Sequence, residues 1–173
     1  MTPSPKQDPI KDGERLNEIA RLRLHDSEID DILNGYVKAA AEEFNLPIAL
    51  VSIVLDDVQK FAAAHGLAGW LAETMGTPVE WSFCANSVRS GDAYVIPDSF
   101  THEDTKENPL VTMDGIACYA GAPMISKNGY IVGNFCVIGQ EQRDFSDAEI
   151  ARLRDYAQRA MNHIEARAAE LSH

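Results

Sequence analysis

The sequence predicts a single α/β domain of the α+β kind, in which helices pack against one face of an antiparallel β-sheet. The chain has 173 residues, of which 45% are hydrophobic and 24% charged. This is the size and composition of one soluble domain with one hydrophobic core. Apolar, β-branched segments come in pairs joined by short polar turns, as antiparallel strands do. Segments with helical spacing of apolar residues precede and follow them.

The charge of the chain argues against one class of partner. Fifteen Lys and Arg residues stand against 27 Asp and Glu residues, which gives a formal net charge of −12. A surface of this sign repels a phosphate backbone instead of releasing its counterions. We therefore expect no nucleic acid partner.

Membrane insertion, secretion and metal binding are also not expected. No apolar run approaches the roughly 20 residues that span a bilayer, and the polar, proline-rich start has no signal-peptide segment. We expect a cytoplasmic protein. The three cysteines, Cys84, Cys118 and Cys136, lack the spacing of a zinc site or a secreted disulfide framework, so reduced thiols are expected.

The N-terminal part predicts a lead-in followed by helices. Residues 1–11 are rich in proline and offer little to bury, so we expect a flexible segment, with the domain spanning residues 12–173. Helical spacing predicts a first helix that ends near His25.

A second helix is predicted to be capped by Asp26 or Ser27 and to end before Asn45. It carries the clearest amphipathic pattern in the first half of the chain.

Five segments are rich in β-branched and aliphatic residues and predict strands. They are residues 47–57, 58–66, 93–98, 116–126 and 130–139. The first two are expected to pair across Asp56 and Asp57, and the last two across a tight turn that ends at Gly129.

The connections between these strands are predicted to be irregular. Residues 67–81 read as a loop, residues 82–88 as a short helical turn, and residues 99–114 as a segment longer than a simple connection requires.

A long helix over residues 146–171 closes the chain. Ser146 and Glu149 have the spacing of a capping box. An apolar stripe follows, made of Ile150, Leu153, Ala157, Ala160, Ile164 and Leu171. Its spacing fits packing on the domain's own sheet, and it also fits a seam with a second helix, so a dimer helix is an open alternative.

Several blocks, taken in order, resemble GAF domains of bacterial signalling proteins over about residues 14–160. The blocks are SFCANSV at 82–88, VIPD at 95–98, NPLV at 108–111, YAGAPM at 119–124, GNFCVI at 133–138 and FSDAEIARL at 145–153. The resemblance implies a sheet of about five or six strands, with N- and C-terminal helices on one face and a loop-roofed pocket on the other.

The resemblance also implies a sensory or regulatory role. Pockets of relatives take a cyclic nucleotide, a tetrapyrrole, a haem or a small metabolite, and other relatives have no known ligand. For this chain we expect an unidentified small molecule or a partner protein, a separate signalling protein as output, and a homodimer through the terminal helices. A ligand-free dimerisation scaffold is an alternative.

The expected pocket wall mixes apolar faces with a few polar groups. The candidate ligand-binding residues are Phe83, Cys84, Asp98, Asn108, Met113 and Tyr119. Phe83 and Met113 also fit a core role, Asp98 fits a cap, and Asn108 before a proline fits a loop that it stabilises itself.

No catalytic residue, metal ligand or cofactor is assigned. The alternative is an enzyme similar to free methionine-(R)-sulfoxide reductase, in which a thiolate attacks the substrate sulfur and a second cysteine resolves it. Cys84 and Cys118 lie where such a pair can meet. However, SFCA is the ordinary non-catalytic form of its block, and the enzyme's third cysteine has no counterpart in SGDAYVIPD. A bilin-type Cys-His pair is absent from the sequence, and His65 and His102 are isolated as haem ligands.

Overall fold

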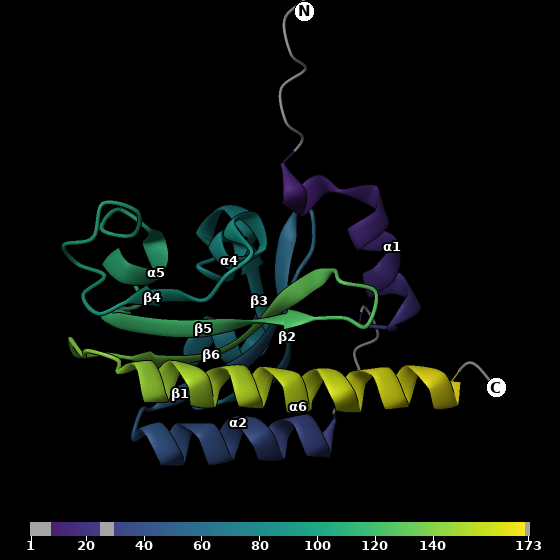
Figure 1. The fold of residues 1–173 in the computed structure, drawn as a ribbon. Coiled ribbons are helices and arrows are strands. Elements are labelled where there is room, and N and C mark those ends of the chain that lie inside the picture. Colours follow the sequence, from purple (N-terminus) through teal and green to yellow (C-terminus); the bar gives the residue numbers. More distant parts are fainter. Residues whose placement is uncertain (1–7, 25–29, 172–173) are drawn as a thin grey trace, which may run out of the picture.

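The structure is a computed structural model that describes residues 8–24 and 30–171. In this part of the chain six strands form one sheet in the order β3-β2-β1-β6-β5-β4, and every neighbouring pair is antiparallel (Figure 1). The strands are β1 (Ile48–Val54), β2 (Val58–His65), β3 (Gly76–Pro78), β4 (Tyr94–Ile96), β5 (Cys118–Ile125) and β6 (Ile131–Gly139). The predicted α+β class and the two predicted hairpins are confirmed.

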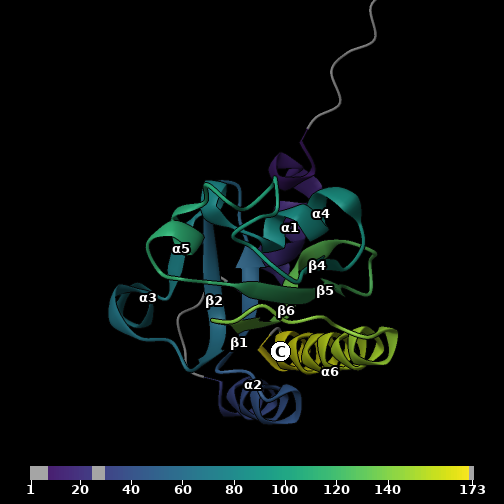
Figure 2. The ribbon, with the colours of Figure 1, turned by 90° about the vertical axis from the view of Figure 1, so that its left-hand side faces the viewer.

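Two helices, α2 (Asp31–Phe44) and α6 (Asp147–Leu171), cover one face of the sheet (Figures 1 and 2). The larger hydrophobic core lies between them and the strands, and Val37, Phe135 and Ile164 are fully buried in it. Most of the apolar stripe of α6 is buried here within its own chain, namely Leu153, Ala157, Ala160 and Ile164, whereas Ile150 is half-buried and Leu171 is exposed. Packing on the domain's own sheet therefore accounts for the stripe, and the dimer stays a prediction.

The capping box of α6 forms as predicted. The backbone N–H of Glu149 donates to Ser146 Oγ at 3.1 Å, and the backbone N–H of Ser146 donates to Glu149 Oε1 at 3.1 Å. None of the helices in the described ranges is both long and apolar enough to cross a membrane.

The start of α2 differs from the prediction. Asp26 and Ser27 lie outside the described residues, and the cap is Asp30, whose Oδ1 accepts from the backbone N–H groups of Ile32 and Leu33. The helix ends at Phe44, before Asn45 as predicted, and Asn45 follows it in a left-handed conformation.

The first helix, α1 (Gly13–Arg21), also ends earlier than predicted, at Arg21 instead of near His25. Leu22 and Leu24 follow it and are almost fully buried. His25 lies outside the described residues.

The predicted flexible lead-in is wrong for its last residues. Pro9–Lys11 form a short 3₁₀ helix, and Ile10 is 1% exposed. Arg15 of α1 fixes this segment, because its guanidinium donates to the Ile10 carbonyl at 2.8 Å and to the Val54 carbonyl at 2.7 Å. The burial of Ile10 and the hydrogen bonds of Arg15 thus extend the folded domain to Asp8.

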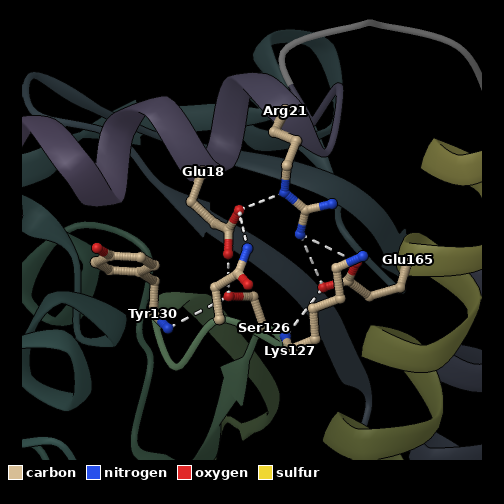
Figure 3. Close-up of polar contacts among 7 residues, drawn as sticks. Glu18, Arg21, Ser126, Lys127, Tyr130 and Glu165 are labelled. Atoms are coloured by element: carbon tan, nitrogen blue, oxygen red, sulfur yellow. Dashed lines mark hydrogen bonds and ion pairs between the residues drawn. The ribbon is translucent and has the colours of Figure 1, made fainter. Parts of the chain in front are cut away.

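A polar network anchors α1 against the turn between β5 and β6 (Figure 3). Glu18 accepts from Ser126 Oγ at 2.5 Å and from Asn128 Nδ2 at 3.2 Å. Arg21 joins Glu18 to Glu165 of α6, with contacts of 2.5 and 3.1 Å. Thus α1 lies by this turn and contacts α6, and its Ile19 is buried in the same core as α2 and α6.

Short elements cover the opposite face of the sheet. They are α3 (Gly69–Thr74), the 3₁₀ helix η2 (Val79–Trp81), α4 (Cys84–Ser90) and α5 (Pro109–Thr112). The predicted loop over residues 67–81 therefore contains a helix and the edge strand β3. Gly76 permits this strand, since a Cβ there would lie 2.6 Å from the Gln59 carbonyl oxygen.

Candidate functional site

A cavity of about 300 Å³ lies between the sheet and the short elements of its second face. Leu50, Phe61 and Cys136 contribute to its floor from β1, β2 and β6, and Leu71 and Leu110 close it from α3 and α5. The wall is mostly apolar. Its volume is at the lower end of the range for small-molecule sites.

Three of the six predicted site residues line this cavity. They are Phe83, Cys84 and Tyr119, all of them buried. Phe83 and Tyr119 meet edge to face, with ring centroids 5.2 Å apart. The fold brings them together because Cys84 opens α4 directly above β5, which carries Tyr119. Their binding of a ligand stays a prediction.

The other three predicted residues lie outside the cavity. Asp98 accepts from the backbone N–H of Phe100 at 3.1 Å, and Asn108 accepts from the N–H of Leu110 at 2.9 Å. Both side chains thus bond to their own loop, as the alternative interpretation held, and Asn108 Nδ2 also donates to the Trp81 carbonyl at 3.1 Å. Met113 is 77% exposed and belongs neither to the cavity nor to the core.

Asp114 is a cavity residue that the sequence analysis missed. Its Oδ1 accepts from the indole Nε1 of Trp70 at 3.0 Å, and its Oδ2 is buried without a hydrogen-bond partner among the described residues. Trp70 in turn meets Trp81 edge to face, with centroids 5.9 Å apart. In the sequence Asp114 is only the last residue of the irregular segment, and nothing local marks it as a cavity residue.

A buried polar cluster extends from the cavity floor. The Cys84 sulfur lies 3.0 Å from the Tyr119 hydroxyl, which accepts from Asn134 Nδ2 at 2.9 Å. Asn134 also donates to Ser87 Oγ at 2.8 Å. The thiol of Cys136 interacts with that of Cys84. Hydrogen bonds thus hold α4 to β5 and β6 underneath the cavity.

The two interacting thiols differ in acidity. Burial opposes ionisation of Cys84, yet hydrogen bonds from Cys136, Tyr119 and Ser52 outweigh it and lower the pKa of Cys84 below its ordinary value. The contact with Cys84, together with burial, raises the pKa of Cys136 well above the ordinary value. Cys84 is therefore the thiol of the pair that ionises first.

The pairing of Cys84 with Cys118, which the reductase alternative requires, is wrong. Alternate residues of a strand point to opposite faces, so Cys118 faces away from its neighbour Tyr119 and toward the side of Ala120, which packs in the α2 and α6 core. Burial raises the pKa of Cys118. The structure brings Cys136 to Cys84 instead.

Metal ligands do not gather around the cavity. Within residues 8–24 and 30–171, no group of three or more His, Cys, Asp or Glu side chains is placed to hold a metal ion. No Lys, Arg or His is found among the described residues that line the cavity.

The fold and the sequence place the chain in one protein family. Residues 28–164 match the profile of the GAF domain, so the chain belongs to the GAF domain family. It is 30% identical over 158 residues to a cyclic di-GMP phosphodiesterase of Pseudomonas aeruginosa. That match covers 90% of this chain and 26% of the relative, so the chain spans about a quarter of that relative's length.

Solved structures share the same fold. The GAF domain of a phosphoenolpyruvate-protein phosphotransferase from Coxiella burnetii superposes with a TM-score of 0.70 at 16% identity, over 93% of this chain and all of that one. Free methionine-R-sulfoxide reductase from Neisseria meningitidis gives 0.66 at 17% identity, over 100% and 98% of the two chains. At such identities the likeness is one of fold alone.

Proposed function

We propose that this chain is a sensory GAF domain whose cavity binds a small molecule, and that occupancy of the cavity is passed to a separate output. The observation that carries this proposal is the cavity itself, which is mostly apolar, roofed by short elements and lined by Phe83, Tyr119 and Asp114. A small-ligand site typically combines such apolar walls with a few polar groups.

The short elements that cover the cavity are the part of the domain that we expect to move when a ligand binds. One exposed hydrogen bond, from Trp70 to Asp114, joins the part around α3 to the part after α5. The α2 and α6 face is a continuous apolar core. A ligand therefore has more freedom to move the roof than the sheet beneath it.

Native mass spectrometry of the purified chain, compared with its denatured mass, tests the proposal. We expect a discrete non-covalent addition that Leu71→Trp, which fills the cavity from α3, removes. Leu171→Trp places the same side chain at the exposed end of α6 and is expected to retain the addition. If no addition is found, and no member of a metabolite library raises the Tm, the sensor proposal fails.

We also propose that the chain does no thiol chemistry on methionine sulfoxide. The placement of Cys84 and Cys118 on opposite faces of the sheet supports this for the predicted pair, since a resolving cysteine must reach the attacking one. Cys136 is the thiol that contacts Cys84, so for that pair the assay decides. The assay is NADPH consumption with thioredoxin and free methionine sulfoxide. Turnover that survives Cys118→Ser but is lost in Cys84→Ser would instead establish a reductase that uses the Cys84 and Cys136 pair.

A further inference from the structure

We infer that the cavity selects an apolar ligand with a cationic or N–H donor group, held by Asp114, and rejects anionic ligands. The inference rests on the proposed sensor function and adds the ligand class to it. It follows from the charge of the cavity wall, from one unpaired carboxylate oxygen and from the way the other polar groups of the wall are used.

The charge of the wall is one-sided. Among the described lining residues Asp114 is a carboxylate, and Lys, Arg and His are missing. An anion entering this cavity would lose its hydration without gaining a cationic partner, and it would approach a like charge. A phosphate or carboxylate ligand is therefore disfavoured at this site.

Asp114 lines the cavity and has one carboxylate oxygen without a hydrogen-bond partner among the described residues. Oδ1 accepts from Trp70 Nε1 at 3.0 Å, whereas Oδ2 is buried and has no partner in the described part of the chain. A buried carboxylate oxygen without a hydrogen bond is costly, so a donor placed against it is favoured. An ammonium or N–H group on a ligand meets this requirement with the complementary charge.

Other polar groups of the wall are already used. Gln59 Oε1 accepts from the hydroxyls of Ser52 and Ser82, and its Nε2 donates to Thr77 Oγ1 at 2.9 Å. Tyr119 and Cys84 bond to each other. Gln140 carries no charge. Asp114 is thus the group that can set the charge preference of the cavity.

The rest of the wall suits an apolar body. Phe83 and Tyr119 present an edge-to-face aromatic pair, and Leu50, Phe61 and Ile138 add aliphatic and aromatic surface. Figure 2 shows α3 and α5 on the same side of the molecule. Trp70 of α3 donates to Asp114, which follows α5. The donor group of a ligand is therefore expected beside Asp114 and its apolar body against Phe83 and Tyr119.

Three probes that share one apolar body but differ in charge test the inference. They are 4-phenylbutylamine, 4-phenylbutanol and 4-phenylbutyrate. Calorimetry at neutral pH gives their affinities, and the fluorescence of Trp70 and Trp81 reports binding near Asp114. We expect the amine to bind at least about tenfold more tightly than the carboxylate, with the alcohol between them.

Asp114→Asn is expected to remove most of this difference while keeping an oxygen for Trp70, and Asp114→Glu is expected to retain it. The matched control is Asp98→Asn, which removes one charge outside the cavity and is expected to leave the order unchanged. Circular dichroism establishes that each variant is folded. If Asp114→Asn does not fold, the order of the three affinities in the unmodified chain decides instead.

The inference is overturned if the carboxylate binds as tightly as the amine, if the amine preference survives Asp114→Asn, or if Asp98→Asn abolishes it equally. It is also overturned if none of the probes binds at millimolar concentration. An anionic molecule retained in native mass spectrometry would leave the sensor function standing and overturn the ligand class alone.

Discussion

His163 of α6 lies with its Nε2 2.7 Å from Oδ2 of Asp30, the residue that caps α2. The same oxygen accepts from Arg167 at 3.0 Å, while the other carboxylate oxygen accepts from backbone N–H groups in the first turn of α2. One carboxylate therefore both begins α2 and joins it to α6, on the face of the sheet opposite the cavity.

Removal of this carboxylate is expected to loosen both helices. We predict that Asp30→Ala lowers the free energy of unfolding by about 1–3 kcal/mol, because the helix cap and the contacts with His163 and Arg167 are lost together. Asp31→Ala, at the next and exposed position, is expected to cost less than about 0.5 kcal/mol. Urea denaturation measures both. If both variants lose the same free energy of unfolding, the prediction is contradicted, because the contacts of Asp30 then add nothing to stability.

Glu18 is expected to make stability depend on acid pH. Burial raises its pKa, but hydrogen bonds from Arg21, Ser126 and Asn128 outweigh this and hold the pKa below its ordinary value of 4.5. A lowered carboxyl pKa contributes stability above the unfolded pKa, and the contribution is lost as pH falls through the folded pKa. Thermal melts of Glu18→Gln should therefore lie below those of the unmodified chain at pH 7 and converge toward them below about pH 4.5. Parallel curves would contradict the prediction.

Two glycines provide a matched pair of substitutions. A Cβ on Gly133 of β6 would lie 1.8 Å from the Ser52 carbonyl oxygen of β1, so Gly133→Ala is expected to cost at least about 3 kcal/mol. A Cβ on Gly35, exposed in α2, meets nothing within 4 Å. Gly35→Ala is expected to stabilise by about 0.5–1 kcal/mol through helix propensity. A tolerated Gly133→Ala, with an unchanged melting temperature, would contradict the close β1–β6 approach.

The order of thiol labelling reports access to the cavity. Methyl methanethiosulfonate is small and uncharged, so we expect it to modify Cys84 first in the native protein, because Cys84 lines the cavity and is the more acidic thiol of its pair. Cys118 is expected to react only as the protein unfolds. Peptide mass spectrometry gives the order, and labelling in urea, where the cysteines should react alike, is the control. Native labelling of Cys118 as fast as Cys84 would be inconsistent with the described faces of β5.

The sequence predicted the parts of the fold whose signal is local. The strands β1 and β6 are mostly apolar because both of their faces are covered, and α6 carries its cap in Ser146 and Glu149. β3 was missed because it has three residues and depends on the close approach of Gly76 to Gln59. Such an approach has no signature in a single sequence.

The site was harder to predict, for a physical reason. Asp98 and Asn108 are short polar residues in a loop, and the sequence does not distinguish side chains that bond to their own backbone from side chains that face a cavity. The position of Asp114 depends on Trp70, which lies 44 residues earlier in the chain. Phe83, Cys84 and Tyr119 were identified through the resemblance, whose blocks contain them.

The strand order has a consequence for synthesis on the ribosome. β1 lies in the middle of the sheet between β2 and β6, so one of its edges is completed only by a strand that ends at Gly139. A growing chain that has made β1 and β2 still presents an unpaired apolar edge until β6 has been made. The nascent chain is therefore most exposed to aggregation, and most in need of a chaperone, until β6 has left the exit tunnel.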